Sequence, residues 1–345
     1  MSYDILFVMK ESKILVTGGL GYVGSHTVVE LIQAGYEVVI VDNLVNSSIE
    51  VLQGIYKITG VMPEFCQMDL RNITLVASLF ENYHFDGVIH FAAYKFVGES
   101  VQKPLMYYEN NVSALVGVLR YYTKGNFIFS SSSTVYGQPK EGQVTELTPM
   151  GRALSPYGKS KAIAEDIIQD CCKVNIDFNA ILLRYFNPIG AHDSTVIGEL
   201  PNGVPQNLVP FIKQTAIGKR KELKVFGNDY PTPDGTCIRD YIHVVDVAKA
   251  HVKALERLLM NKADTNCEVF NVGTGRGSSV LEVIQAFEAV SGQDLNYSFV
   301  SRRQGDYIQA YADTSKINTL LGWRSEKTLK EALLSAWLWE QKING

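Results

Sequence analysis

The first half of the chain alternates short apolar runs with segments of helical length. The apolar runs are continuous, which is typical of strands that are buried on both faces of a parallel sheet. A regular repeat of strand and helix favours a doubly wound α/β sheet. We predict strands over Lys13–Thr17, Glu37–Asp42, Glu64–Asp69, Gly87–Ala92, Phe127–Ser132 and Phe178–Tyr185, and helices over Tyr22–Ala34, Ile73–Tyr83, Val101–Lys124 and Pro156–Val174.

The sequence changes character after about Asn187. A proline-rich stretch follows, and the apolar runs become shorter and less regular. A length of 345 residues suits two domains. We therefore expect one domain over residues 1–186 and a smaller α/β domain over 187–345, with some segments returning to the first. The elements expected after residue 187 are Leu223–Phe226, Val244–Leu259, Glu268–Val272, Ser279–Val290, Asn296–Val300 and Leu329–Lys342.

Composition excludes several classes of protein. Hydrophobic residues make up 46% of the chain and charged residues 20%, which are ordinary globular values and exclude disorder, collagen and coiled coil. The net charge is −4 and no basic cluster is present, so we expect no nucleic-acid partner.

Cysteine, histidine and hydropathy patterns bear on the compartment. The five cysteines form no CxxC pair and the six histidines show no ligand spacing, so we expect reduced thiols and no metal site. The apolar run Ile5–Met9 is too short for the core of a signal peptide. The uncharged stretch Ile14–Val29 is interrupted by glycines and is not expected to span a membrane. We expect a soluble cytoplasmic protein, and we assign no role to the first eleven residues.

A glycine-rich turn joins the first predicted strand to the first predicted helix. Gly18, Gly21 and Gly24 have the spacing GxxGxxG. Glycines at such a turn permit a tight bend and a close approach of the backbone to a pyrophosphate, which sits on the helix N-terminus. The turn therefore predicts a dinucleotide site, with a purely structural turn as the alternative.

Acidic residues end the next two predicted strands. Asp42 follows Gly24 by 42 − 24 = 18 residues, where an acid accepts hydrogen bonds from the adenosine ribose diol and repels a 2′-phosphate. Asn43 comes next, with no arginine beside it to hold that phosphate, so the pattern favours NAD over NADP. Asp69 either accepts from the adenine amino group or caps the following helix.

The stretch Tyr157–Lys161 is the most informative for chemistry. Tyr157 and Lys161 stand four residues apart, hence on one face of the predicted helix. A nearby cation lowers the pKa of a tyrosine, and a tyrosine so tuned can move a proton to and from a hydroxyl group. An exposed pair on an amphipathic helix is the alternative.

Hydroxyl side chains gather where the fifth predicted strand ends. The residues 130–134 read Ser-Ser-Ser-Ser-Thr. Ser130 and Ser132 would share one face of the strand, and a hydroxyl there could pair with that of Tyr157. The carboxyl ends of parallel strands are where such sheets bind ligands. Hydrogen bonding of a polar strand end to the next loop is the alternative.

These features together resemble the extended short-chain dehydrogenase/reductase superfamily and, within it, the UDP-glucose 4-epimerase family. The resemblance extends from about residue 13 to the C-terminal region. It rests on Val16–Thr27, Ala93–Ser100, Phe127–Gly137, Ser155–Lys161, Leu183–His192, Phe226–Tyr230, Arg239–Asp246 and Arg302–Asp306.

The resemblance implies reversible 4-epimerisation of UDP-galactose and UDP-glucose with tightly bound NAD. The sugar would be oxidised transiently at C4 and reduced on the opposite face, with no net oxidant. Tyr157 would be the acid/base, Lys161 would hold the nicotinamide ribose and lower the pKa of Tyr157, and Ser132 would be the catalytic serine. The implied Rossmann-type domain, residues 1–186, would bind NAD through Gly18, Gly21, Tyr22, Val23, Gly24, Asp42, Asn43, Asp69, Lys95, Asn110, Tyr157, Lys161 and Tyr185.

The resemblance also implies a UDP-sugar site, mainly in residues 187–345. Arg239 and Arg303 suit a diphosphate, because guanidinium groups bind it through paired hydrogen bonds. Phe226 would stack on uracil, and Asp306 would accept from the uridine ribose. A solvated surface charge is the alternative for each arginine alone. The implied substrate residues are Lys95, Ser132, Tyr157, Asn187, Asn207, Leu208, Phe226, Arg239, Tyr241, Arg303, Asp306 and Ala310.

One position of this set bears on substrate range. Family members limited to UDP-hexoses carry a tyrosine seven residues after the second arginine of the RR-x-GD stretch. That position is Ala310 here, and Tyr311 is its neighbour. A small residue leaves room for an N-acetyl group, so we expect UDP-GalNAc and UDP-GlcNAc to be substrates as well. A shift of the alignment by one residue would place Tyr311 there instead.

Other functions on the same fold stay open. The sugar-nucleotide dehydratases carry an acidic pair where this chain has Ser133 and Thr134, which argues against them. A UDP-glucuronate decarboxylase or 4-epimerase and a non-enzymatic NAD-binding regulator are the remaining alternatives. The resemblance further implies a homodimer through the helices near Val101–Lys124 and Pro156–Val174, the first of which has apolar residues beyond one face.

Overall fold

The computed structural model of the protein describes residues 12–151, 153–200, 203–303 and 306–345. The first eleven residues, and positions 304–305 of the RR-x-GD stretch, lie outside the described residues. The chain divides into two compact units. Unit 1 holds the chain up to Ser132 together with Pro156–Arg184 and Ala248–Phe270, and unit 2 holds Ser133–Ser155, Tyr185–Val247 and Asn271–Gly345.

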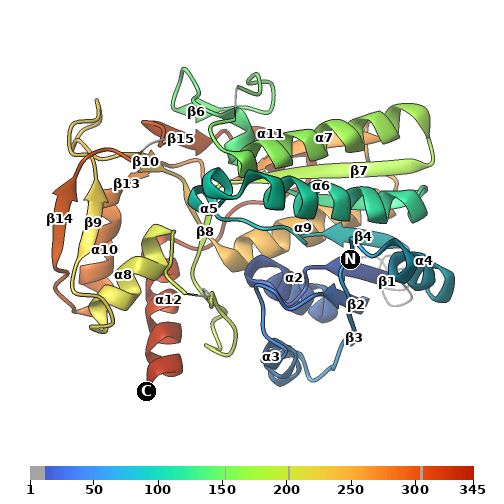
Figure 1. Ribbon diagram of the computed structural model, residues 1–345, viewed down its shortest axis with the longest axis horizontal. Helices are drawn as coiled ribbons and strands as arrows, with labels where there is room; N and C mark the ends of the chain where they lie inside the picture. The colour runs from blue at the N-terminus through green and yellow to red at the C-terminus, as the bar shows by residue number, and fades with distance from the viewer. Residues whose placement is uncertain (1–11, 152, 201–202, 304–305) are drawn as a thin grey trace. The chain divides into compact units, whose positions relative to one another are not determined.

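Unit 1 is built on a seven-stranded sheet with the order β12-β7-β5-β4-β1-β2-β3 (Figure 1). Strand β1 pairs in parallel with both β2 and β4. The chain winds outward from β1 to β3 and then crosses to β4, so the winding reverses between β1 and β4. This is the predicted doubly wound sheet, and the fold class is confirmed. The strands are β1 (Lys13–Thr17), β2 (Glu37–Asp42), β3 (Glu64–Gln67), β4 (Gly87–His90), β5 (Gly125–Ser132), β7 (Phe178–Tyr185) and β12 (Cys267–Val272).

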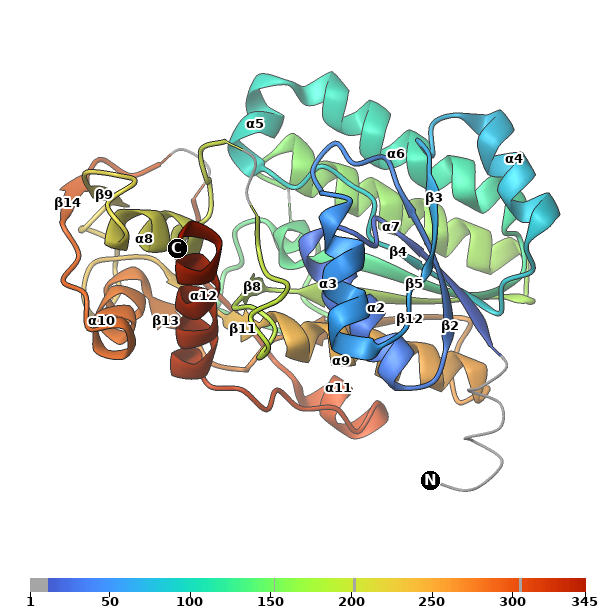
Figure 2. The same cartoon turned by 90° about the horizontal axis from the view of Figure 1, so that it is seen from below.

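Helices cover both faces of this sheet. Figure 2 shows α4, α6 and α7 on one face and α2, α3 and α9 on the other. The apolar runs therefore face helices on both sides, and Leu15, Val88 and Phe127 are fully buried. The helices are α2 (Tyr22–Gln33), α3 (Glu50–Thr59), α4 (Ile73–Asn82), α5 (Val97–Gln102), α6 (Pro104–Tyr121), α7 (Pro156–Val174) and α9 (Val244–Leu259).

One predicted helix is wrong. The expected helix Val101–Lys124 is two helices, because α5 ends at Gln102 and α6 begins at Pro104. Proline lacks an N–H and disfavours helical geometry in the residue before it, so Lys103 adopts φ −129° and ψ 58°. Two strands are also shorter than expected, since β3 ends at Gln67 and β4 ends at His90.

The described part of unit 2 contains small sheets, the α-helices α8, α10, α11 and α12, and the 3-10 helix η1 (Ser133–Tyr136). A four-stranded sheet has the order β13-β10-β15-β6, and two pairs, β11-β8 and β14-β9, stand beside it. Phe287 and Trp337 meet edge to face in the core between α10 and α12, with ring centroids 5.5 Å apart. The elements are β6 (Gln143–Val144), β8 (Asn187–Ile189), α8 (Leu208–Ala216), β9 (Leu223–Phe226), β10 (Ile238–Arg239), β11 (Tyr241–His243), β13 (Ser278–Ser279), α10 (Val280–Ser291), β14 (Tyr297–Val300), β15 (Gln309–Ala312), α11 (Ser315–Leu320) and α12 (Leu329–Asn344).

Among the helices in the described ranges, none combines the length and the apolar character needed to cross a bilayer.

Candidate functional site

The glycine turn lies between β1 and α2, where the sheet reverses its winding. Gly18 has φ +68°, and a Cβ atom there would lie 2.7 Å from the backbone nitrogen of Ala92, just beyond β4. A Cβ atom on Gly24 would lie 2.3 Å from the carbonyl oxygen of Gly18. Gly21 is the N-cap residue of α2, and no side chain caps the first backbone N–H groups of the helix. A helix N-terminus without a side-chain cap suits a phosphate group.

Asp42 is held rigidly at the end of β2. Its Oδ2 accepts from the backbone N–H of Leu20 at 3.1 Å, within the glycine turn. Its Oδ1 accepts from the N–H of Leu44 at 2.9 Å and from the hydroxyl of Ser47 at 2.8 Å. These bonds fix the carboxylate beside the turn while leaving acceptor capacity on Oδ2. The position fits an acid that reads a ribose diol.

Asp69 lies before α4, and the sequence left open whether its side chain caps that helix. The side chain of Asn72, and not that of Asp69, caps α4 by accepting from the N–H of Leu75. Asp69 instead pairs with Arg71, whose Nη2 lies 2.7 Å from Oδ2. Hydrogen bonds from Arg71 lower the pKa of Asp69 to about 2. The capping alternative for Asp69 is therefore wrong. The side-chain amide of Asn43 also donates to Asp69, at 3.4 Å.

Lys95 stands near the same turn, whereas Asn110 is held within α6. The ammonium of Lys95 lies 5.5 Å from the ring centroid of Tyr22, the first residue of α2. Asn110 is buried in α6 and donates to the side chain of Asn111 at 3.1 Å. Together with the glycine cradle and Asp42, these groups fit the donor and acceptor pattern of a dinucleotide. Among the other predicted cofactor residues, Val23 lies in the first turn of α2 and Tyr185 ends β7.

The predicted catalytic residues lie at the carboxyl end of β5 and the start of α7. Ser132 is the last residue of β5, and Tyr157 and Lys161 lie in the first two turns of α7. All three are buried, so the exposed-pair alternative for Tyr157 and Lys161 is wrong. The Nζ of Lys161 donates to the carbonyl oxygen of Ser130 at 2.6 Å and lies 4.7 Å from the ring centroid of Phe129.

Burial sets the ionisation of the groups around Lys161. It lowers the pKa of Lys161 to about 7, and the charge of Glu165 opposes that effect. On the neighbouring strand β4, burial lowers the pKa of His90 to about 3, with the charge of Lys161 as a further cause. His90 is therefore neutral at physiological pH, and its Nδ1 is 2.9 Å from the hydroxyl of Thr17.

Sequence reasoning missed a buried ion pair in the same unit. Arg184 on β7 and Glu165 on α7 are both buried, and the Nη2 of Arg184 is 2.6 Å from Oε2 of Glu165. The hydroxyl of Ser131 donates to Oε1 of the same carboxylate. A signal was present in the sequence, because Arg184 interrupts an otherwise apolar strand and Glu165 follows Lys161 by one helical turn.

In unit 2, the predicted diphosphate and ribose residues meet. Arg303 donates to Asp306 through Nη2 at 2.6 Å, and Nη2 of Arg239 lies 3.8 Å from the same carboxylate. Arg239 is buried and stacks 3.7 Å from the ring centroid of Tyr307, so it is not a solvated surface charge. Arg303 is half exposed and lies 5.6 Å from the ring centroid of Phe226. Two arginines, a carboxylate and an exposed aromatic ring thus share one region.

The remaining predicted substrate residues are also in unit 2. Asn207 is the N-cap residue of α8, and Leu208 is the first residue of that helix. Asn187 and Tyr241 are register partners in the parallel pair β8-β11. Of these four residues, Tyr241 lies close enough to Arg239 and Asp306 for their charges to act on its phenol, whose pKa is raised mainly by burial.

Ala310 lies on strand β15 in register with Arg239 of β10. Register partners in a parallel pair point to the same face, and successive residues point to opposite faces. Ala310 is buried, while the ring of Tyr311 lies against Gly277, at 3.2 Å from the position of an added Cβ. Ala310, and not Tyr311, therefore shares a face with Arg239.

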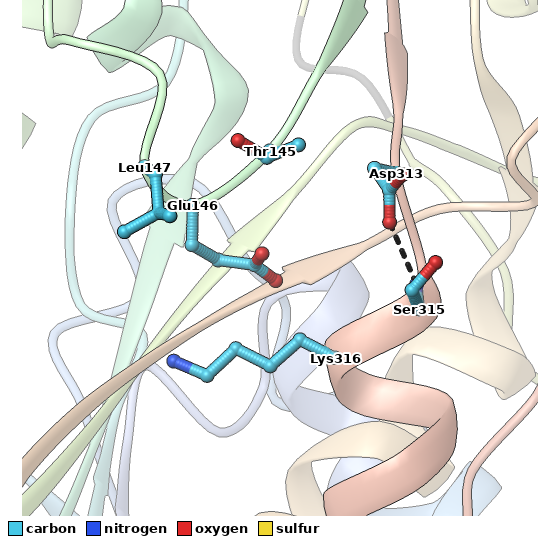
Figure 3. Close-up of a pocket in the computed structure, with 6 residues that line it drawn as sticks. All are labelled: Thr145, Glu146, Leu147, Asp313, Ser315 and Lys316. Carbon is cyan, nitrogen blue, oxygen red and sulfur yellow. Dashed lines mark hydrogen bonds between the residues drawn. The ribbon is translucent and has the colours of Figure 1, made fainter.

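A separate pocket of about 460 Å³ occurs within unit 2 (Figure 3). The residues Thr145, Glu146, Leu147, Asp313, Ser315 and Lys316 line it. Its polar groups have structural partners, because Glu146 accepts from the N–H of Asn271 at 2.7 Å and Asp313 accepts from the N–H of Ser315 at 2.8 Å. None of the predicted site residues lines it, and we assign it no chemistry.

The chain is similar to known proteins along nearly its whole length. Residues 15–335 match the family described as GDP-mannose 4,6 dehydratase. The UDP-glucose 4-epimerase of Bacillus subtilis is 48% identical over 336 residues, which cover 96% of this chain and 98% of that protein.

Two solved structures are similar along nearly the whole chain. The UDP-glucose-4-epimerase from Stenotrophomonas maltophila, with bound NAD and formylated UDP-arabinopyranose, has a TM-score of 0.93 and 44% identity, covering 97% of this chain and 99% of that one. The enzyme from Bifidobacterium longum, in complex with NAD+ and UDP, has a TM-score of 0.91 and 44% identity, covering 96% and 99%. The chain therefore belongs to the UDP-glucose 4-epimerase family of the extended short-chain dehydrogenases/reductases.

Proposed function

We propose that the protein interconverts UDP-galactose and UDP-glucose through transient oxidation at C4 with tightly bound NAD. One observation carries the proposal. The buried Lys161 is fixed on the carbonyl of Ser130 at the end of β5, one helical turn from the buried Tyr157, in the unit that also holds the glycine turn. A buried tyrosine beside a buried cation is suited to proton transfer and is of little use for packing alone.

The cofactor-binding residues support NAD over NADP. Gly18, Gly21 and Gly24 shape the turn on which a pyrophosphate would rest, and Asp42 would accept from the ribose hydroxyls. The carboxylate of Asp42 would repel a 2′-phosphate. When bound, NAD supplies the electron acceptor for oxidation at C4 and then the donor for reduction of the keto sugar.

The chain's own residues handle the proton. Tyr157 accepts the proton of the C4 hydroxyl during oxidation and returns it during reduction. The positive charge of Lys161 favours the phenolate form of Tyr157. Ser132 holds the C4 oxygen through its hydroxyl. Because the proton and the electron pair both return to the sugar, the cycle consumes no oxidant.

Unit 2 would hold the nucleotide part of the substrate. Arg239 and Arg303 would bind the diphosphate, and the half-exposed ring of Phe226 would stack on uracil. Asp306 would then exchange its arginine contacts for the ribose hydroxyls. In this proposal, residues 1–186 mainly bind the cofactor, and residues 187–345 mainly bind the UDP part of the substrate.

The experiment that tests the function is proton NMR of the purified protein with UDP-galactose and no added NAD. We expect UDP-glucose to accumulate to an equilibrium mixture. Tyr157→Phe removes only the phenol hydroxyl, and we expect it to slow the reaction by about 10²-fold or more. An unchanged spectrum after NAD is also supplied would refute the proposal, and UDP-glucuronate would be the next substrate to test.

The substrate range extends to N-acetylated sugars in this proposal. The face that Ala310 shares with Arg239 supports the alignment that places a small residue, and not Tyr311, beside the sugar. A methyl side chain there leaves room for the N-acetyl group of UDP-GalNAc and UDP-GlcNAc.

We also propose that the protein is a cytoplasmic homodimer. All five cysteines lie within the described ranges and are free thiols, which suits a reducing compartment. Leu105 and Val116 of α6 are exposed apolar side chains, at 79% and 38% of their full area. Activity in the cytosolic fraction of lysed cells is the expected result for the location.

A further inference from the structure

The ion pair of Glu165 and Arg184 is buried in unit 1, as is the pair of Arg257 and Glu268, but only the first involves a residue of α7. Glu165 is fully buried and Arg184 is almost so, and Arg184 donates to both carboxylate oxygens, through Nε at 3.0 and 3.1 Å and through Nη2 at 2.6 Å. Burying two charges costs solvation free energy that their attraction repays only in part, and apolar residues often serve stability as well. A role other than stability is therefore expected.

The pair is linked to the catalytic end of β5 by two consecutive serines. Lys161 donates to the carbonyl of Ser130, and the hydroxyl of Ser131 donates to Glu165. Lys161 and Glu165 are one turn apart on α7. Two side chains of α7 are thus hydrogen-bonded to adjacent residues of β5. These bonds hold the first turns of the helix, and with them Tyr157, against the strand.

The titratable groups around Lys161 come from four elements, α7, β4, β7 and β12. On α7 itself the nearby charge is Glu165, and on β4 the imidazole of His90 is neutral because burial lowers its pKa to about 3. Behind Glu165 stand Arg184 on β7 and the thiol of Cys267 on β12, which interacts with both of them. The ring of Phe129 on β5 covers the ammonium. Among these described neighbours, Glu165 is the anion that acts on Lys161.

We propose that Glu165, held in place by Arg184 and Ser131, is a positioning residue that keeps Lys161 charged and fixed beside Tyr157. The inference rests on the proposed function, because it gives Lys161 and Tyr157 the roles stated above. Ser131, for which the resemblance implies no role, becomes the link between strand and carboxylate.

The test is a pH titration of Tyr157 in the holoenzyme. Tyrosinate absorbance is followed for the wild type and for Glu165→Gln, each compared with the same protein carrying Tyr157→Phe, so that the difference isolates Tyr157. A neutral residue at 165 removes the attraction that favours the ammonium of Lys161, and a neutral Lys161 no longer favours the phenolate. We expect the midpoint of Tyr157 ionisation to rise by about one pH unit, and the acid limb of kcat to move with it.

Two further variants keep the test decisive. Ile168→Val removes one methyl group from the buried face of α7, and we expect a lower Tm with the Tyr157 midpoint unchanged. If Glu165→Gln does not fold, the double variant Glu165→Gln with Arg184→Met removes both charges and leaves no unpaired arginine; we expect a smaller shift in the same upward direction, because the cation is lost together with the anion. A folded variant with an unaltered midpoint overturns the inference. A shifted midpoint in Glu165→Gln together with a wild-type protein that lacks epimerase activity would instead overturn the function, and only the electrostatic link from Glu165 to Tyr157 would stand.

Discussion

Ala310 and Tyr311 are adjacent residues with opposite environments. Ala310 shares a face with Arg239, and the ring of Tyr311 packs near Gly277 and Ile238 on β10. Alternation along a strand thus decides which of the two side chains the sugar would meet. The sequence alone could not decide this, because its alignment allowed a shift by one residue.

Ala310→Tyr should narrow the substrate range. The added ring would occupy the space that we propose for the N-acetyl group, so activity on UDP-GalNAc should fall by about 10-fold or more, while activity on UDP-galactose is retained. Coupled assays of kcat/KM on both substrates measure the ratio. Tyr311→Phe, on the opposite face, is the matched control and should leave the ratio unchanged. An equal loss on both substrates would show that Ala310 does not select between them.

The serine run shows what a sequence can predict about single residues and what it cannot. Its place at the end of a buried strand was predictable from the apolar run before it. The separate tasks of its members were not. Ser130 acts through its carbonyl and Ser131 through its hydroxyl, and both contacts depend on residues of a helix that begins at Pro156.

At the scale of elements, the longer buried strands and the helices between them were predictable, because a continuous apolar run marks each strand and a segment of helical length separates one run from the next. The expected bounds of β1, β2, β7 and α7 are confirmed to the residue. Some elements of two to four residues in unit 2, such as β10 and β15, escaped prediction because they are too short to show a period, whereas the four-residue strand β9 was predicted to the residue. The break at Pro104 could have been predicted from the proline alone.

Gly24→Ala tests whether the turn and α2 form one cofactor-binding element. The new methyl group would lie 2.3 Å from the carbonyl oxygen of Gly18, so the helix must move away from the turn. We expect a loss of stability of about 1–3 kcal/mol and of most of the bound NAD. Heat denaturation and the NAD content of the purified protein measure the two effects. Val283→Ala, in the core of unit 2, is the control: it should lower Tm by a similar amount and retain NAD. NAD bound at the wild-type level in Gly24→Ala would contradict the assignment of the turn.

At the scale of the molecule, the chain passes back and forth between its two units. Residues 133–155 precede α7 yet belong to unit 2, and Ala248–Phe270 belongs to unit 1 although it follows most of unit 2. The expectation that some segments return to the first domain allows for this, but composition and periodicity report local order and not which segments pack together, so those segments could not be named. The glycine turn lies in unit 1 and the arginine cluster in unit 2, while Tyr185, predicted for the cofactor, lies in unit 2 and Ser132 and Tyr157, predicted also for the substrate, lie in unit 1.

The exposed side of α5 and α6 is the surface we expect a second copy to cover. Val101, Leu105 and Val116 are exposed by 59%, 79% and 38%, although α6 already buries Leu115 and Val118 inside unit 1. Apolar side chains gathered on one exposed side of two successive helices favour association. Glu109 and Arg120 stand among them and would lie at the rim of such a contact.

Leu105→Glu with Val116→Glu should convert the dimer to a monomer. Two carboxylates on each copy would face those of its partner without counter-charges, and their desolvation opposes association. Light scattering coupled to size-exclusion chromatography at micromolar concentration measures the mass. Tyr56→Glu, which changes an equally exposed aromatic residue on α3 across the sheet, should leave the dimer intact. Because Tyr157 and Lys161 are fixed by contacts inside one copy, the monomer should keep its Tyr157 titration even where its stability falls. A wild-type protein that is monomeric at these concentrations would refute the dimer itself, whereas a dimeric double variant would place the interface on another surface.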